Sequence, residues 1–404
     1  RALFDPNDYR SVRANAEGLF FVPLSVSHGA RVGTREYVKK VAAACPDRLV
    51  VLLDSLATRV VFDEERRATG VEIIRGAHLY RAAAGSEACA PVAPPEVVRA
   101  KREVILAGGV FNTPQLLMLS GVGPRDALEA QGIDVVSDLS GVGQNLQDRY
   151  EIGVVSEMVD DFAVLEGTNL PRATDGVIDP ELARWQRSGT GPYSSNGIVS
   201  ALIKKSRPEL SVPDLFLFGL VGRFHGYYPG YSRELVATKR HFTWGVLKAH
   251  TQNRAGEVRL RSRDPRDPPD IHFRYFQEGS AGHEDDLRAV VEGVETVRRI
   301  MRSAGDCVAG EIIPGPAVAT REQIANYVRA HAWGHHASCS SKMGATNDPA
   351  AVVDSRFRVR GTRGLRVVDA SVFPRIPGFF IVSSVYMLAE KASDTILEDA
   401  RARG

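Results

Sequence analysis

The sequence has little cysteine, little net charge and no long apolar run. Its 404 residues include four cysteines, and no two of them form a CxxC motif or a zinc knuckle, which argues against a disulfide scaffold. The 51 Lys and Arg residues nearly balance the 49 Asp and Glu residues, so the net charge of +2 gives no field that would draw the protein onto nucleic acid. No apolar run approaches the roughly 20 residues that span a bilayer, so we expect no transmembrane segment.

The composition is otherwise that of a folded globular protein. Apolar residues make up 44% and charged residues 25% of the chain, which excludes a largely disordered, collagen-like or coiled-coil protein. The length predicts two or three domains. The chain begins with Arg1 rather than Met, and its first residues do not resemble a signal peptide. We therefore expect a processed chain or a piece of a longer protein, and a cytoplasmic location is favoured.

Local patterns predict a mixed α/β fold. Residues 79–100 are rich in Ala and Pro without periodicity and predict a surface loop. After residue 151 the character changes, and the strands at 212–221, 241–247 and 256–260 predict an antiparallel sheet. The other expected strands are 48–53, 58–62, 71–74, 102–106 and 365–368. The expected helices are 35–45, 115–119 onward, 284–301, 321–330 and 385–397, of which 284–301 has the clearest helical spacing.

The first motif with chemical meaning is Ala107-Gly108-Gly109, which joins an expected strand to an expected helix. Glycine lets a backbone approach a ligand closely, and a helix N-terminus offers free N–H groups to a phosphate or ribose. On its own an ordinary Gly-Gly turn is the commoner explanation.

The second motif is the expected strand at 365–368, which opens into Asp369-Ala370-Ser371. A buried strand that ends in Asp and small residues suits a nucleotide at the carboxyl edge of a sheet. An ordinary strand-to-loop cap is the commoner explanation when the motif is taken alone.

The third motif is a histidine cluster, His331, His335 and His336, within six positions. The spacing matches no zinc pattern, and Cys339 is not placed as a paired ligand, so we expect no metal here. A general base suits histidine because its ordinary pKa lies near neutral pH. Structural histidines remain the alternative for the cluster on its own.

Together and in this order, the three motifs resemble the glucose–methanol–choline (GMC) family of FAD-dependent oxidoreductases. Gly108–Pro124 resembles the second sequence signature of that family, and Ser140–Asp148 resembles the segment that follows it, with Arg149 where a His is usual. Gly361–Leu397 resembles the C-terminal region. The likeness is strong over 30–150 and 320–404 and looser between them.

The resemblance implies a GMC-type FAD-binding domain and a substrate domain with antiparallel sheet and helices. It divides the chain into a partial FAD-binding domain at 1–150, a substrate-binding domain at 151–320 and the C-terminal part of the FAD-binding domain at 321–404.

The resemblance also assigns catalytic roles. The family has a His seven residues before Met-Gly, and counting back from Met343 gives His336 as the base that removes the hydroxyl proton of the substrate. His335 is then a neighbour that orients His336 or simply packs. The second catalytic position, His or Asn in the family, is occupied by Phe380. Either His336 acts alone, which we favour, or Ser383 or Ser384 substitutes, or the chemistry differs.

For FAD, the resemblance implicates nine residues near the adenosine, the pyrophosphate and ribityl chain, and the flavin. They are Ala57, Ala107, Gly108, Gly109, Asp369, Ala370, Phe380, Ile381 and Val382. The family also has a Gly-rich GxGxxG turn that binds the FAD pyrophosphate. The nearest match, Gly141-Val142-Gly143, lacks the third glycine and its strand. We expect this turn on a missing N-terminal segment, which would act as a partner, and expect the chain alone to hold FAD poorly and to be possibly inactive.

The expected activity is the oxidation of a hydrophobic alcohol to an aldehyde or ketone, with FAD as cofactor. Phe379, Phe380, Ile381 and Val382 indicate an apolar pocket rather than one for a sugar or choline. The electron acceptor is oxygen, a quinone or a protein. Two rivals stay open: flavin chemistry of another kind, such as light-driven decarboxylation of a fatty acid, and a non-catalytic binding or scaffold protein.

Overall fold

The computed structural model describes residues 5, 6, 8–86, 93–169, 179–276 and 282–402. The chain divides into two compact units, each built from three stretches of sequence. Unit 1 comprises 1–51, 149–249 and 284–334, and unit 2 comprises 52–148, 250–283 and 335–404. The two units divide the chain differently from the expected domains, so the domain boundaries at 150 and 320 stay a prediction.

Unit 1 is built on a six-stranded antiparallel sheet with the order β1-β12-β13-β14-β11-β17. Its strands are β1 (Gly18–Phe20), β11 (Tyr150–Met158), β12 (Ile198–Lys204), β13 (Leu215–Val221), β14 (His241–Lys248) and β17 (Val308–Ile313). A short hairpin of β2 (Val26–Ser27) and β3 (Ala30–Arg31) lies outside this sheet. The helices of unit 1 are α1 (Tyr9–Arg13), α2 (Thr34–Ala44), α5 (Pro180–Ser188), α6 (Tyr231–Leu235), α7 (His283–Ser303) and α8 (Arg321–His331).

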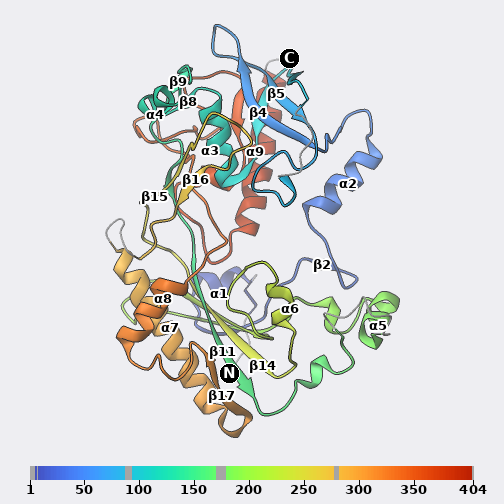
Figure 1. The fold of residues 1–404 in the computed structure, drawn as a ribbon, viewed down its shortest axis with the longest axis vertical. Helices are drawn as coiled ribbons and strands as arrows, with labels where there is room; N and C mark the ends of the chain where they lie inside the picture. The colour runs from blue at the N-terminus through green and yellow to red at the C-terminus, as the bar shows by residue number, and fades with distance from the viewer. Residues whose placement is uncertain (1–4, 7, 87–92, 170–178, 277–281, 403–404) are drawn as a thin grey trace. The chain divides into compact units, whose positions relative to one another are not determined.

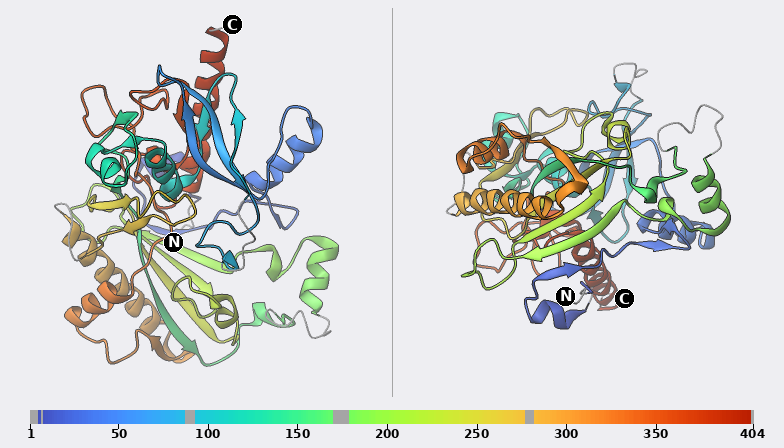
Figure 2. Two further views of the ribbon diagram at one scale, coloured as in Figure 1. Left: turned by 45° about the horizontal axis from the view of Figure 1, so that its top comes forward. Right: turned by 90° about the horizontal axis from the view of Figure 1, so that it is seen from below.

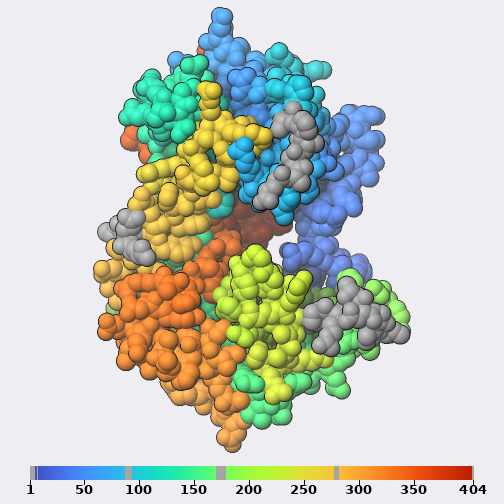
Figure 3. Space-filling view, in the orientation of Figure 1, coloured from blue at the N-terminus to red at the C-terminus, as the bar shows by residue number. Residues whose placement is uncertain are grey.

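Helix α7 packs its apolar face on the sheet of unit 1. Its buried residues include Leu287, Val290, Val294 and Val297, spaced three or four apart, so they form one stripe along the helix. Gly293 lies at the closest approach, where an added Cβ would stand 2.3 Å from Val246 Cγ1 on β14. Figure 3 shows the outer side of α7 and α8 in orange on the surface of this unit.

The described part of unit 2 contains two three-stranded sheets and two parallel strand pairs. The strands β4 (Ser55–Phe62), β5 (Ala68–Arg75) and β6 (Glu96–Arg99) form one sheet, and β10 (Gln144–Leu146), β15 (Gly256–Arg259) and β16 (Asp270–His272) form another. The strands β7 (Val104–Leu106) and β18 (Leu365–Val367) pair in parallel, as do β8 (Val122–Gly123) and β9 (Ser137–Asp138). The helices are α3 (Gly109–Leu119), α4 (Arg125–Ala130) and α9 (Val382–Ala402).

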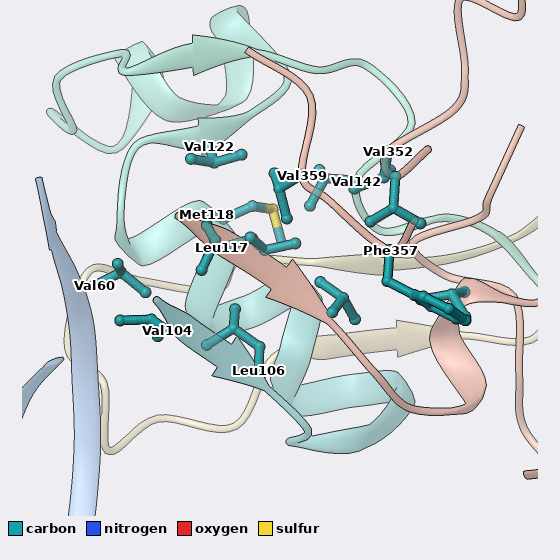
Figure 4. Packing of buried hydrophobic residues seen from close by; sticks show 14 of the residues in the cluster. Val60, Val104, Leu106, Leu117, Met118, Val122, Val142, Val352, Phe357 and Val359 are labelled. Atoms are coloured by element: carbon teal, nitrogen blue, oxygen red, sulfur yellow. The ribbon is translucent and has the colours of Figure 1, made fainter. Parts of the chain in front are cut away.

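The core of unit 2 surrounds the parallel pair. Leu106 of β7, Val367 of β18 and Leu117 of α3 are fully or almost fully buried, and they pack in one cluster that Figure 4 shows from close by. Arg366, also on β18, is 1% exposed and donates to Glu103 Oε2 at 2.9 Å and to Asp399 Oδ2 at 2.7 Å. This ion pair ties the end of α9 to the strand pair.

The mixed α/β fold class is confirmed, and so are most of the expected elements. The helices expected at 35–45, 284–301 and 321–330 are α2, α7 and α8, and the strands expected at 58–62 and 241–247 are β4 and β14. The helix expected at 385–397 runs longer, from Val382 to Ala402. Among the described residues, no helix is both long and apolar enough to cross a membrane.

Four expectations are wrong. Residues 48–53 form no strand, because no described strand pairs with them, and Val50 and Leu53 are 70% and 75% exposed. The loop expected at 79–100 ends in the edge strand β6, which pairs with β5. Strand β15 belongs to unit 2 and not to the sheet of β13 and β14. Helix α3 begins at Gly109, six residues before the expected start.

Candidate active site

The first two motifs meet at one edge of the parallel pair in unit 2. β18 pairs with β7 in the register Val367↔Leu106, so both strands run in the same direction and end side by side. Ala107-Gly108 follows β7 and Asp369 follows β18. The carboxyl ends of parallel strands are where open α/β sheets bind ligands, so the topology places both motifs at such an edge.

Asp369 closes this edge by capping helix α3. Its Oδ2 accepts from the backbone N–H of Gly109 at 3.0 Å and from the Thr113 hydroxyl at 2.6 Å, and its Oδ1 accepts from the Ser371 N–H at 2.8 Å. The Thr113 hydroxyl in turn accepts from Gly108 N–H at 3.0 Å. A negative charge at a helix N-terminus is favoured by the free N–H groups and the helix dipole. This explains why α3 starts at Gly109 although its first half holds glycine and proline.

The segment that follows His336 is hydrogen-bonded to both motifs. Cys339 N–H donates to the Ala370 carbonyl at 3.0 Å, and Ser341 N–H donates to the Ser371 carbonyl at 2.8 Å. The Ser340 hydroxyl donates to the carbonyl of Val110 in α3 at 2.6 Å. The three motifs, separated by up to 260 residues, therefore form one connected site within unit 2.

His336 is 7% exposed and lies between two other rings. Its ring centroid is 4.3 Å from that of His335, which is exposed, and 5.4 Å from that of Phe380, which meets it edge-on at 62°. Its backbone N–H donates to Asp148 Oδ1 at 2.8 Å. The rings of His336 and Phe380 are thus in contact. Phe380 is 37% exposed.

The remaining expected site residues lie outside the edge formed by the ends of β7 and β18. Ala57 lies on β4 opposite Ile73, in a sheet separate from the parallel pair. Val382 is the first residue of α9, and Ser383 and Ser384 follow it on the same helix. His331 ends α8 in unit 1, where its ring stacks on Tyr327 at 4.2 Å. The three histidines of the cluster therefore belong to different units: His331 to unit 1, and His335 and His336 to unit 2.

Two family models match this chain. Both carry the description GMC oxidoreductase, one over residues 6–151 and the other over residues 251–389, and together they cover more than half of the chain. The chain belongs to the GMC oxidoreductase family. Its relatives in this family are FAD-dependent oxidoreductases.

Curated relatives agree with this assignment. The chain is 35% identical over 388 residues to the oxygen-dependent choline dehydrogenase of Brucella ovis, which covers 94% of this chain and 64% of that protein. It is 33% identical over 366 residues to the glucose methanol choline oxidoreductase atC of Aspergillus terreus, covering 86% of this chain and 55% of that protein. The chain thus spans just under two thirds of the length of the choline dehydrogenase.

Solved structures share the fold. A formate oxidase from Aspergillus oryzae RIB40 matches with a TM-score of 0.81 and 24% identity, over 100% of this chain and 68% of that chain. Pyridoxine 4-oxidase from Mesorbium loti matches with a TM-score of 0.69 and 21% identity, over 91% of this chain and 62% of that chain. At these identities the match shows the GMC fold and nothing finer.

The edge next to α3 fits FAD, the cofactor of this GMC fold. The backbone of Ala107 and Gly108 is exposed, and Gly109 has φ +82 with no atom within 4 Å of an added Cβ, so open space lies beside the helix N-terminus. The buried hydroxyls of Ser341 and Ser371 have no hydrogen-bond partner among the described residues. Buried polar groups are nearly always bonded, so a polar ligand beside them is consistent with this arrangement.

Sequence reasoning missed the residues that hold His336 in place. In the sequence Asp148 stands out only as the last residue of the Ser140–Asp148 segment, and Tyr275 and Thr251 carry no signal at all. Tyr275 donates its hydroxyl proton to Asp148 Oδ2 at 2.9 Å, and Thr251 donates to the Asp148 carbonyl at 2.9 Å. No local sequence pattern predicts such contacts, because the partners come from distant parts of the chain.

Proposed function

We propose that this protein uses FAD to oxidise a hydrophobic alcohol to an aldehyde or ketone, with His336 as the general base. The observation that carries the proposal is the assembly of the three motifs in unit 2. A buried histidine on one segment is hydrogen-bonded, through that segment, to the helix cap at Asp369 and to α3.

The residues of the α3 edge would hold the cofactor. Ala107, Gly108 and Gly109 would face the adenosine, and Asp369 and Ala370 would lie near the pyrophosphate and ribityl chain. Phe380, Ile381 and Val382 would face the flavin. When bound, FAD supplies the two-electron oxidation of the substrate.

His336 would accept the hydroxyl proton of the alcohol. A neutral imidazole nitrogen is an acceptor, and a positioned base of this kind contributes about 100- to 10,000-fold to the rate. Phe380 has no group that donates or accepts a proton. In this proposal His336 acts alone as the base, with His335 as its neighbour.

The apolar side chains around Phe380 support an aliphatic or aromatic alcohol. Phe379 and Ile381 are partly buried, and Phe380 and Val382 present apolar surface at 37% and 57% exposure. The relative from Brucella ovis is named a choline dehydrogenase, so choline is the competing substrate. A sugar, which needs many polar partners, fits this surface poorly.

The test is anaerobic flavin reduction in the FAD-bound protein with 1-octanol, benzyl alcohol, choline and glucose. We expect reduction by the two hydrophobic alcohols. Turnover of choline or glucose far above that of the hydrophobic alcohols would refute the substrate class. Alkane production from a fatty acid under illumination would favour the decarboxylation alternative, and a protein without a flavin spectrum would favour a non-catalytic one.

The base is tested by His336→Ala. We expect the flavin spectrum to remain and the rate constant of flavin reduction to fall by about 100-fold or more. His331→Ala is the matched control, because that histidine belongs to α8 in unit 1. Unchanged reduction in His336→Ala would show that another group is the base, and His335→Ala would then be the first candidate.

A further inference from the structure

Asp148 is a buried carboxylate that contacts three distant segments of unit 2. It is 3% exposed. Its Oδ1 accepts from the His336 backbone N–H at 2.8 Å, its Oδ2 accepts from the Tyr275 hydroxyl at 2.9 Å, and its carbonyl accepts from the Thr251 hydroxyl at 2.9 Å. Hydrogen bonds to a carboxylate are shorter and about twice as strong as neutral ones. The carboxylate is thus fixed on one side and holds the main chain of His336 on the other.

The residue before Asp148 holds the same segment and a second one. Gln147 and Ser338 exchange two backbone hydrogen bonds, at 3.0 and 2.8 Å, just after His336. The Gln147 side-chain oxygen accepts from the Ile376 N–H at 3.2 Å, four residues before Phe380. Gln147 is 2% exposed. Residues 147 and 148 therefore brace both chain segments that bring the rings of His336 and Phe380 together.

We propose that Asp148, itself oriented by Tyr275, is a positioning residue for His336. The inference rests on the proposed function, in which His336 is the base. The bond to the backbone N–H holds the main chain of His336 in place and so fixes the point from which its ring projects. Catalysis depends on such placement, since a displacement of about 1 Å can lower a rate about 100-fold. Asp148 does not itself take part in the proton transfer.

The competing explanation is that Asp148 only stabilises the fold. A structural role would lower stability without acting through His336, and the two explanations differ in three measurements on the FAD-bound protein. The first is the rate constant of flavin reduction by benzyl alcohol. The second is amide hydrogen exchange at His336, which reports the bond whether or not the enzyme turns over. The third is the effect of the variant in a His336→Ala background.

For Asp148→Ala we expect the reduction rate to fall about 100-fold and the His336 amide to exchange faster. Asp148→Asn keeps an oxygen that accepts from His336 and an amide that can donate to the Tyr275 oxygen, so it should recover most of the rate. Asp354→Ala is the control, because Asp354 is another carboxylate of unit 2 that accepts from backbone N–H groups, those of Arg356 and Arg358. It should leave the reduction rate unchanged.

The double variant separates the outcomes. If Asp148 acts through His336, Asp148→Ala adds no further loss in the His336→Ala background. An additional, multiplicative loss there, or an unchanged rate in Asp148→Ala alone, would overturn the inference. If His336→Ala itself reduces flavin normally, the proposed function fails instead. Should Asp148→Ala not fold, Tyr275→Phe removes only the donor to Oδ2, and an unchanged rate and His336 amide exchange in that variant would also overturn the inference.

Discussion

The ion pair between Arg366 and Asp399 makes a quantitative prediction about acid stability. Asp399 is 19% exposed at its side chain, and it accepts from Arg366 at 2.7 Å and from Arg356 at 2.7 Å. The hydrogen bond from Arg366, followed by that from Arg356, lowers the pKa of Asp399 from 3.8 to about 2. One pKa unit corresponds to about 1.4 kcal/mol. The charged carboxylate therefore contributes about 2 kcal/mol to the stability of the folded unit.

The sign follows from the lowered pKa. A group whose folded pKa lies below its unfolded value stabilises the protein fully above the unfolded pKa, and this contribution is lost as the pH falls through the folded value. The loss should occur between about pH 4 and pH 2. Asp399→Asn should remove the contribution at neutral pH and should not show that part of the acid loss.

The assay is amide hydrogen exchange of α9, to which Asp399 belongs. All three tryptophans, Trp185, Trp244 and Trp333, lie in unit 1, so their fluorescence does not report on unit 2. A loss of about 2 kcal/mol should make the protected amides of α9 exchange about 30-fold faster at neutral pH. Asp394→Asn is the control, because it is the same exchange at an exposed position of the same helix. Equal effects of both variants, or an undiminished acid loss in Asp399→Asn, would refute the reasoning.

Three further changes test other parts of the structure. Gly293→Ala should destabilise unit 1 by about 1–2 kcal/mol, because the clash with Val246 outweighs the gain in helix propensity. Trp fluorescence in urea measures the change in stability. If Gly293→Ala is equally destabilising in a Val246→Ala background, the clash is not the cause. Asp179→Ala should lower the free energy of unfolding of the same unit by about 1–2 kcal/mol, since its carboxylate caps α5; an unchanged urea midpoint would contradict the cap. Asp369→Ala should weaken FAD binding about tenfold or more, because it removes the hydrogen bonds that hold the backbone of Gly109 in place at the start of α3. Titration of FAD into the flavin-free protein measures this, with wild-type affinity as the contrary result.

Local pattern predicted the elements whose formation depends mainly on their own residues. The apolar spacing of 284–301 gave α7, because the same stripe that marks the helix also packs on the sheet. The short apolar runs at 58–62 and 241–247 gave β4 and β14, because their apolar side chains are buried in a sheet. Residues 48–53 show the limit of this reasoning. Their β-branched and apolar residues favour a strand, but a strand needs a partner, and no local pattern reveals that none of the described strands pairs with them.

The candidate site was predictable only as separate motifs. The order of the motifs pointed to the GMC family and so to His336 and Phe380, whose rings the structure places 5.4 Å apart. The early start of α3 was not predictable, since its cap is supplied by Asp369, 260 residues further along the chain. The bond from His336 to Asp148 crosses 188 residues. Contacts over such separations depend on the whole fold, which local propensity does not encode.

The exposed run at 50–53 has a consequence for handling the protein. Val50, Val51, Leu52 and Leu53 are between 44% and 75% exposed, and the backbone of this run is paired in no described sheet. A short, uncharged, β-favouring segment with open backbone groups is a template for intermolecular strand pairing. The protein should therefore self-associate as its concentration rises. Val51→Lys should raise the concentration at which turbidity appears.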